Sequence, residues 1–349
     1  METAERVRTA VRGLTPGYFA LVMASGIVSM GLHLQGYAAL SLVLLGVGVI
    51  AFVVLLVLTA WRALVYRDAL VADFMHSGRA FGFFTFIAGT NVVGTRLGME
   101  GMPVATAVLL AVGGLSWLVL GYVIPWTAVL SSDERPVVIN ANGTWFIWVV
   151  ASQSVAVSAA SIEPVFDAAR DQLAVVAVVS WSVGVVLYAA AGIFVSARLM
   201  IYELRPEDLN PPYWVAMGAC AITVVAGARI IEMTDAPMVN ATRGLIGGLS
   251  VTFWAFATWL IPVLVAAGWW RHARRRVPLT YEATLWSVIF PLGMYAVAGI
   301  YLGRARELPL VEFIGATELW VALAAWMVTL VAMIVHLVRT VVLPSASEA

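Results

Sequence analysis

One apolar stretch near residue 290 combines a bulky ring with two residues that weaken a helix. In LWSVIFPLGMYAVAGIYLG, Phe290 precedes Pro291, and Gly293 follows two positions later. Proline removes a backbone hydrogen bond and loosens the preceding turn, while glycine lets another backbone or a solute come close. In a helix that faces inward, such a ring would plug a narrow conduit, because hydrophobic constrictions exclude water. The alternative is an ordinary packing role, which is usual for phenylalanine in a membrane helix.

Three arginines lie near the same predicted surface. Arg229 stands in VVAGARIIEM, within the last turn of an apolar stretch, and Arg96 and Arg243 are expected close to the same surface. Arg229 either extends its side chain to the membrane interface or joins the other two in an electropositive vestibule. A cation there would lower the energy of an entering anion by about 4 kcal/mol at 4 Å and an effective dielectric of ~20, before desolvation is subtracted.

Polar side chains are concentrated in two of the apolar stretches. Thr90 and Asn91 lie in residues 80–97, and Ser152 and Gln153 lie in residues 142–160. Hydroxyl and amide groups in hydrocarbon need protein partners or water. These four side chains are therefore candidate lining residues of a wet cavity, whereas the almost wholly aliphatic stretches 37–61 and 319–338 are expected to face lipid.

The composition requires a membrane. Of the 349 residues, 62% are hydrophobic and only 11% are charged, and the mean hydropathy is +0.94. Soluble domains carry about 25% charged residues, so a soluble globular protein is excluded. About 20 apolar residues span a bilayer as a helix. The sequence contains ten such stretches, at about 14–34, 37–61, 80–97, 103–126, 142–160, 173–200, 212–231, 245–269, 283–302 and 319–338.

The connections predict the topology. They are short, which leaves one polytopic domain over residues 1–349 and no room for a soluble one. With the N-terminus inside, 14 of the 20 arginines fall on the cytoplasmic side and 6 on the outer side. The positive-inside rule then places both termini in the cytoplasm of a cell-membrane protein. The formal net charge of zero gives no indication of a nucleic-acid partner.

Signals for an enzyme or a cofactor are missing from the sequence. It contains no HExxH, GxSxG or CxxC motif and no phosphate-binding glycine loop, and its four histidines lack metal-ligand spacing. We therefore expect no enzymatic activity, no metal and no cofactor. No acid stands in the middle of a predicted span, which weighs against a proton-driven carrier, because such carriers use intramembrane carboxylates or histidines.

The ten stretches form five predicted hairpins. Their polarity predicts that the odd-numbered helices lie inside the bundle and the even-numbered helices outside, in an all-α integral membrane fold. Three stretches in this order are similar to one known family: PGYFALVMASGIVSMG (16–31), NGTWFIWVVASQSVAV (142–157) and PLTYEATLWSVIFPLGMYAVA (278–298). The chain resembles the tellurite-resistance/dicarboxylate transporter family, which includes bacterial tellurite-resistance proteins, fungal malate permeases and sulfite exporters, and plant slow anion channels.

The resemblance implies more than the composition does. It implies an inner ring of five odd helices around a central pore in each subunit, and assembly as a homotrimer. In the channel branch, a phenylalanine before a proline on the ninth helix closes the conduit, and Phe290 before Pro291 matches that position.

Three functions are compatible with these features. The first is passage of small anions through a pore gated by Phe290. The second is export of a C4-dicarboxylate, sulfite or tellurite-type oxyanion coupled to protons, although no arginine is placed with certainty at mid-membrane to pair with a dicarboxylate. The third is a membrane enzyme or scaffold in which the helices only pack. The expected partners are small anions and membrane lipid.

Overall fold

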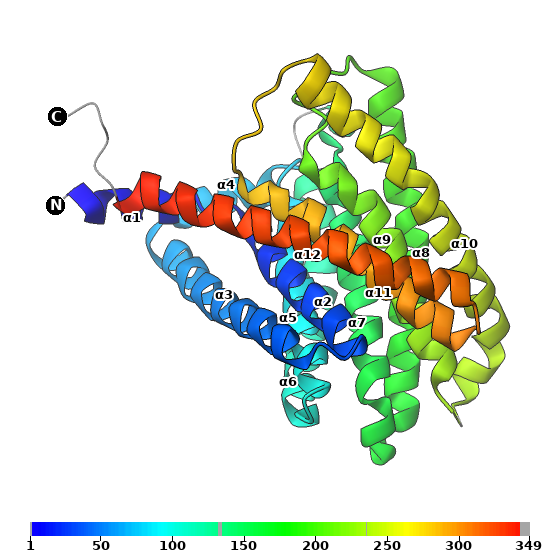
Figure 1. The fold of residues 1–349 in the computed structure, drawn as a ribbon. Coiled ribbons are helices and arrows are strands. Elements are labelled where there is room, and N and C mark those ends of the chain that lie inside the picture. Colours follow the sequence, from blue (N-terminus) through cyan, green and yellow to red (C-terminus); the bar gives the residue numbers. More distant parts are fainter. Residues whose placement is uncertain (1, 132–134, 235, 343–349) are drawn as a thin grey trace.

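The computed structural model describes residues 2–131, 135–234 and 236–342, which form an all-helical bundle (Figure 1). Within these residues, nine helices are long and apolar enough to cross a membrane. Helices of two kinds alternate along the chain, and they differ in length and in burial.

Five short helices are buried, and each continues from a single 3₁₀ turn. They contain 15 to 20 residues. In the spans that include α2, α7, α9 and α11, 78 to 89% of the residues in the most apolar window are buried. Turn and helix are, in order, η1 (Pro16–Phe19) and α2 (Ala20–Leu34), η2 (Ala80–Phe83) and α5 (Phe84–Gly98), η5 (Gly143–Trp145) and α7 (Phe146–Ile162), η8 (Pro211–Trp214) and α9 (Val215–Glu232), and η10 (Ala283–Leu285) and α11 (Trp286–Ala305).

Five longer helices cover the buried ones. They contain 22 to 33 residues, and only 11 to 33% of their most apolar windows is buried. They are α3 (Ala38–Val65), α6 (Pro103–Ile124), α8 (Arg170–Ile201), α10 (Pro237–Trp269) and α12 (Pro309–Leu337). Many of their large aliphatic and aromatic side chains are exposed, as expected of surfaces that face lipid. The predicted division into inner odd and outer even stretches agrees with this difference in burial.

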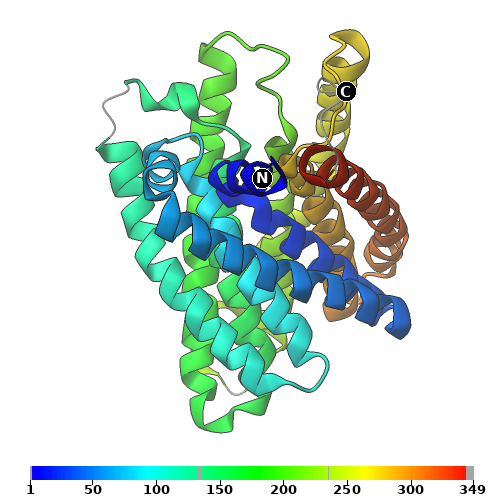
Figure 2. The same ribbon diagram turned by 90° about the vertical axis from the view of Figure 1, so that its left-hand side faces the viewer.

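Shorter elements join or end these helices. The α-helices are α1 (Glu2–Arg12) and α4 (Arg67–Met75); the π-helical turns are η3 (Pro125–Leu130), η9 (Trp270–Arg274) and η11 (Val338–Val342); and the 3₁₀ turns are η4 (Val137–Asn140), η6 (Glu163–Val165) and η7 (Asp167–Ala169). α1 lies beside the end of α12 and contacts η11, so the first and last described helices meet (Figure 1 and Figure 2).

Each buried helix contacts two other buried helices. The contacts run from α2 to α5, α7, α9 and α11, and α11 contacts α2. The 3₁₀ turns that precede these helices contact one another in the same order. Gly143 permits one of these approaches, since a Cβ at this position would lie 2.2 Å from the carbonyl carbon of Pro212. The N-terminal ends of all five buried helices are therefore gathered at one end of the molecule.

Side-chain hydrogen bonds connect the outer helices to the buried ones. Bonds of this kind contribute about 0.6–2 kcal/mol each between membrane helices. Trp117 of α6 donates to Ser152 of α7, Gln153 of α7 donates to the carbonyl of Trp181 in α8, the indole of Trp181 donates to the carbonyl of Thr223 in α9, and Trp326 of α12 donates to Ser25 of α2.

The helix α5 is enclosed by protein but is not among the nine apolar candidates. Its sequence FTFIAGTNVVGTRLG includes Thr90, Asn91 and Arg96, which lower its mean hydropathy. Because α2, α6 and α7 pack around it, these side chains meet protein groups rather than lipid. The low hydropathy of this stretch therefore does not conflict with a position inside the bundle.

Candidate functional site

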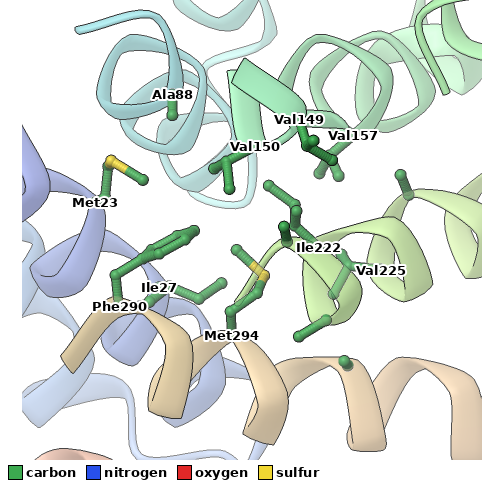
Figure 3. Close-up of a cluster of buried hydrophobic side chains, with 14 of the residues drawn as sticks. Met23, Ile27, Ala88, Val149, Val150, Val157, Ile222, Val225, Phe290 and Met294 are labelled. Atoms are coloured by element: carbon green, nitrogen blue, oxygen red, sulfur yellow. The ribbon is translucent and has the colours of Figure 1, made fainter. Parts of the chain in front are cut away.

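Phe290 lies in the middle of the cluster where the buried helices meet. Its side chain is 1% exposed. The ring projects from α11 toward Val150 of α7 and lies between Met23 of α2 and Met294 (Figure 3). Ala88 of α5 and Ile222 of α9 belong to the same cluster (Figure 3), so all five buried helices contribute side chains around this ring.

Pro291 and Gly293 fix how α11 approaches its neighbours. A Cβ on Gly218 of α9 would lie 2.8 Å from the Cγ of Pro291, so glycine is required there for the close approach of the proline ring. On the opposite side, a Cβ on Gly293 would lie 2.9 Å from the Cγ2 of Ile27. The turn that carries Phe290 is therefore packed against both α9 and α2.

A small cavity lies next to the Phe290 cluster and is lined by all five buried helices. The space open to the centre of a water molecule is about 10 Å³, close to the minimum that holds one water. The lining residues are Ile27, Met30, Asn91, Val92, Thr95, Ser154, Val157, Ile222, Val225 and Met294. Ile27 and Met294 belong to both the cavity and the Phe290 cluster, so the two are adjacent.

Asn91, Thr95 and Ser154, on α5 and α7, belong to the lining, although the surface of the cavity is almost wholly apolar. The amide nitrogen of Asn91 donates to the Oγ of Ser154 over 3.0 Å. The Oδ1 of Asn91 and the Oγ1 of Thr95 are buried, and neither has a hydrogen-bond partner among the described residues. The amide of Asn91 lies against α6, since a Cβ on Gly113 would be 2.8 Å from its Oδ1. The unsatisfied oxygen is therefore explained by packing between α5 and α6 and is not evidence of water in the cavity.

The structure separates the four polar side chains that the sequence singled out. Asn91 lines the cavity. Thr90 donates back to the carbonyl of Phe86 within its own helix. Ser152 and Gln153 hydrogen-bond to α6 and α8, respectively. Of the four, only Asn91 is among the described lining residues of this cavity.

Arg96 is completely buried in the last turn of α5. Its Nε donates to the Oγ of Ser29 over 3.0 Å, and its Nη2 donates to the Oγ of Ser41 over 2.7 Å. The same Nη2 lies 2.7 Å from the Oε1 of Glu100, which also lies 3.4 Å from the Nδ1 of His33. The guanidinium therefore connects α2, α3 and α5, and Glu100 neutralises its charge.

The other two arginines of the predicted vestibule have different partners. The Nη1 of Arg229 lies 2.6 Å from Glu232, and its guanidinium carbon lies 5.5 Å from the centre of the Tyr301 ring. Arg243 donates to the carbonyl oxygens of Ile231 and Met233, near the C-terminal end of α9. Arg243 thus satisfies carbonyl groups that the end of the helix leaves without partners.

Sequence reasoning missed several residues of this region. Thr95 and Ser154 lie in the two stretches recognised as polar but were not chosen as lining candidates. Both belong to the cavity lining, and Thr95, four residues after Asn91, shares its helix face. The contact of Gly218 with Pro291 joins segments distant in sequence, so no local pattern indicates it. Glu318 lies inside α12, because that helix begins at Pro309 rather than near residue 319. The expected span 319–338 excluded this half-buried carboxylate, which lies in the first half of α12.

These features define a class of protein. The bundle is a multi-pass membrane protein whose five buried helices carry polar side chains and together line a small internal cavity. Among the described residues, no group of three or more His, Cys, Asp or Glu side chains is placed to hold a metal ion.

Comparison with known proteins identifies the family. Residues 13–334 match the SLAC1 family, described as voltage-dependent anion channel, so the chain belongs to this family. The family resemblance stated from the three sequence stretches is confirmed. Its members are channels and transporters, and the expectation that the chain is not an enzyme agrees with this membership.

Individual relatives extend over different parts of the chain. An uncharacterized membrane protein of Mycobacterium tuberculosis is 64% identical over 155 residues, which are 44% of this chain and 79% of the relative. Two uncharacterized transporters of Methanocaldococcus jannaschii are 23% and 22% identical; they cover 95% and 93% of this chain and 95% of their own lengths. Similarity to proteins named as transporters thus covers nearly the whole chain.

Proposed function

We propose that the chain is a channel for small anions, with a conduit between the five buried helices. In this proposal α5 is the tenth membrane crossing, the ten helices are five hairpins, and the inner five form a ring. The pairwise contacts of α2, α5, α7, α9 and α11 support the ring. The observation that carries the proposal is the cavity, because every one of these helices contributes to its lining.

Phe290 is the proposed gate. The cavity beside it has room for about one water molecule, which is too small for a hydrated anion. Methionine side chains on two sides of the ring are flexible and can be displaced by rotation of their bonds. Pro291 removes a backbone hydrogen bond near this turn, so the ring can move without breaking a regular helix. The structure therefore corresponds to a closed state of the proposed channel.

The selectivity of the proposed channel among anions would depend on the side chains along the conduit. Arg96 and Arg229 are paired with Glu100 and Glu232, whereas Arg243 donates only to neutral oxygen atoms in its described contacts. Of the three arginines, Arg243 would therefore contribute most to the positive charge of an outer vestibule, because no acid neutralises it in its described contacts. The described lining of the cavity includes no charged side chain, so an anion would meet no fixed cation there. Its passage would then depend on its size and its cost of dehydration.

Replacement of Phe290 tests the gate. Phe290→Ala should raise chloride or nitrate flux from reconstituted vesicles on the order of tenfold, which corresponds to a barrier lower by about 1.4 kcal/mol. Removing a buried ring also reduces stability, so a matched variant is needed. Phe84 is equally buried but stacks on Trp148, with ring centres 6.0 Å apart.

The matched variant Phe84→Ala should therefore lose stability without a rise in flux. An intermediate increase is expected for Phe290→Leu, because leucine fills part of the same space. If the Phe290→Ala variant elutes as a folded protein and its flux equals that of wild type, Phe290 is not the gate. Equal increases in both alanine variants would point to general loosening of the bundle.

Glu318 favours a second candidate, a proton-coupled oxyanion exporter. A half-buried carboxylate within a membrane helix is the type of group that proton-driven transporters use. Reversal potentials separate the two functions. A channel follows the anion gradient at fixed pH, whereas a coupled exporter also shifts with the proton gradient, and Glu318→Gln should then abolish that shift.

Substrate, assembly and orientation are parts of the same proposal. Flux assays with chloride, nitrate, malate, sulfite and tellurite separate small anions from C4-dicarboxylates and tellurite-type oxyanions. Absence of flux for all of them would favour a scaffold. The family resemblance supports a homotrimer, which light scattering of the purified protein measures. The arginine distribution supports a position in the cell membrane with both termini in the cytoplasm.

A further inference from the structure

A large apolar groove opens on the lipid-facing side of the molecule, between α8 and α10. We call it the α8–α10 groove. Its volume is about 980 Å³, at the upper end of the range for sites that bind small molecules. Its walls include Ile193 and Met200 of α8 and Leu260 and Val263 of α10, and Ile289 of α11 is also part of the lining. Both walls belong to the helices whose surfaces are exposed and apolar.

One part of this groove is polar and positively charged. Arg271 lines it, and three further arginines follow within five residues. The Nη1 of Arg271 donates to the carbonyl of Leu209 over 2.8 Å, and its Nη2 lies 4.0 Å from the Oε1 of Glu282. The Nε of Arg271 and the Oδ1 of Asn210 are buried without a hydrogen-bond partner among the described residues. His272, which also lines the groove, makes its described hydrogen bond to the carbonyl of Val277.

A second apolar groove provides an internal comparison. It lies between α1, α2, α3 and α12 and has a volume of about 680 Å³. The titratable side chains of its described lining are Tyr18, Tyr281, Glu282 and His336, and this lining includes no arginine. The two grooves are both apolar, but only the α8–α10 groove combines apolar walls with arginine.

We propose that the α8–α10 groove binds an anionic phospholipid, with an acyl chain between the helices and the phosphate at Arg271, and that this lipid holds the Phe290 turn in place. Apolar walls on the membrane-facing side match an acyl chain. A guanidinium with an unsatisfied Nε matches a phosphate, to which arginine donates strong charge-assisted hydrogen bonds. The amide of Asn210 adds a polar group that can contact the headgroup.

The link to the gate is a contact along α11 and rests on the proposed function. Val288 and Ile289 line the groove, and Phe290 is the next residue. A chain in the groove therefore supports the turn that carries the ring from the side opposite the conduit. Pro291 leaves this turn with fewer backbone hydrogen bonds of its own, so external support has a large effect on its position. An empty groove gives the turn room to move and opens the conduit.

Two glycines in the groove allow a direct test of lipid binding. A Cβ on Gly192 of α8 or Gly268 of α10 would meet nothing within 4 Å, so a leucine at either position has open space where it begins and should occupy part of the groove. Gly248→Leu is the matched control, because Gly248 also has open space around it, lies on α10 and is outside the groove. Arg271→Gln removes the headgroup charge, and Arg274→Gln is its control within the same arginine cluster.

Native mass spectrometry of the full-length protein with added phosphatidylglycerol measures lipid retention. Arg271→Gln should retain about fivefold less phosphatidylglycerol than wild type, the effect expected for one arginine near an anionic surface. Gly192→Leu and Gly268→Leu should also retain less, because their side chains occupy space that the acyl chain needs. Gly248→Leu and Arg274→Gln should retain as much as wild type. Equal retention by all variants overturns the proposal. A change of oligomeric state in the leucine variants also overturns it, because the occupant would then be a second copy of the chain.

Anion flux tests the link to Phe290 separately. Wild-type flux should be about fivefold lower in vesicles that contain phosphatidylglycerol than in vesicles of phosphatidylcholine alone. This factor assumes that the bound lipid stabilises the closed turn by about the binding free energy of one arginine with an anionic lipid. Gly268→Leu should give low flux in both lipids. Phe290→Ala should give high flux in both. Lipid-independent wild-type flux overturns the link, while failure of Phe290→Ala to raise flux overturns the proposed gate and leaves the retention result as evidence for the lipid site.

Discussion

The interface between α11 and α12 differs from the cluster around Phe290 in the kind of atoms that are close together. At the interface, backbone meets backbone: a Cβ on Gly299 would lie 2.8 Å from the Cα of Gly315, and one on Gly315 would lie 2.5 Å from the carbonyl oxygen of Ala296. Around Phe290, by contrast, side chains surround the ring, among them Met23, Val150 and Met294 (Figure 3).

This difference indicates which contacts can move. Backbone atoms in adjacent helices cannot yield without shifting whole helices, whereas side chains change rotamer at small cost. The α11–α12 contact at Gly299 and Gly315 is therefore expected to be rigid, whereas the proposed gate is surrounded by side chains that can change rotamer. Opening by side-chain movement requires no separation of helix pairs.

The largest effect should come from placing a side chain in the rigid interface. Gly299→Leu should destabilise the protein by more than about 3 kcal/mol, because overpacking against backbone cannot be relieved by rotamer changes. Thermal unfolding and the folded yield in detergent measure this loss. Gly46→Leu, on α3 where a Cβ meets nothing within 4 Å, should be tolerated. Met294→Leu in the adaptable cluster should cost less than about 1.5 kcal/mol, and a loss equal to that of Gly299→Leu would contradict the comparison.

A smaller effect is expected at the buried arginine that joins α2, α3 and α5. Arg96→Gln should destabilise the protein by about 2 kcal/mol, below the usual loss for a broken buried pair because Glu100 is 31% exposed. Arg304→Gln is the control, since Arg304 and Glu312 form an exposed pair whose loss should cost at most about 1 kcal/mol. Equal losses in the two variants, measured by thermal unfolding, would show that Arg96 is not a structural link.

The smallest effect should appear as a pH dependence. The hydrogen bond from Arg96 holds the pKa of Glu100, which lies in the connection after α5, below its ordinary value of 4.5. The unfolded chain binds this proton more readily than the folded chain. The stabilising contribution is therefore complete above the ordinary pKa and disappears as the pH falls through the lowered one. Wild-type unfolding temperature should fall more between pH 5 and pH 3 than that of Glu100→Gln, and parallel curves would exclude this contribution.

Features that depend on local sequence could be predicted, whereas features that depend on contacts between residues far apart in the sequence could not. The apolar runs identified the membrane helices, and their polarity separated buried stretches from exposed ones. The central position of Phe290 was anticipated only because its stretch resembles a known family. Ser152 and Gln153 look like cavity residues in the sequence, but the rotation of α7 directs them to α6 and α8. That rotation depends on packing between helices, as does the contact of Gly218 with Pro291.

The gathered 3₁₀ turns have an electrical consequence. Because η1, η2, η5, η8 and η10 contact one another in sequence, the five buried helices start at the same end of the molecule and run in the same sense. Their peptide dipoles add, so partial positive charge collects at the end with the turns and partial negative charge at the other. A passage among them has built-in polarity even where its side chains are neutral, and currents of equal driving force in opposite directions need not be equal.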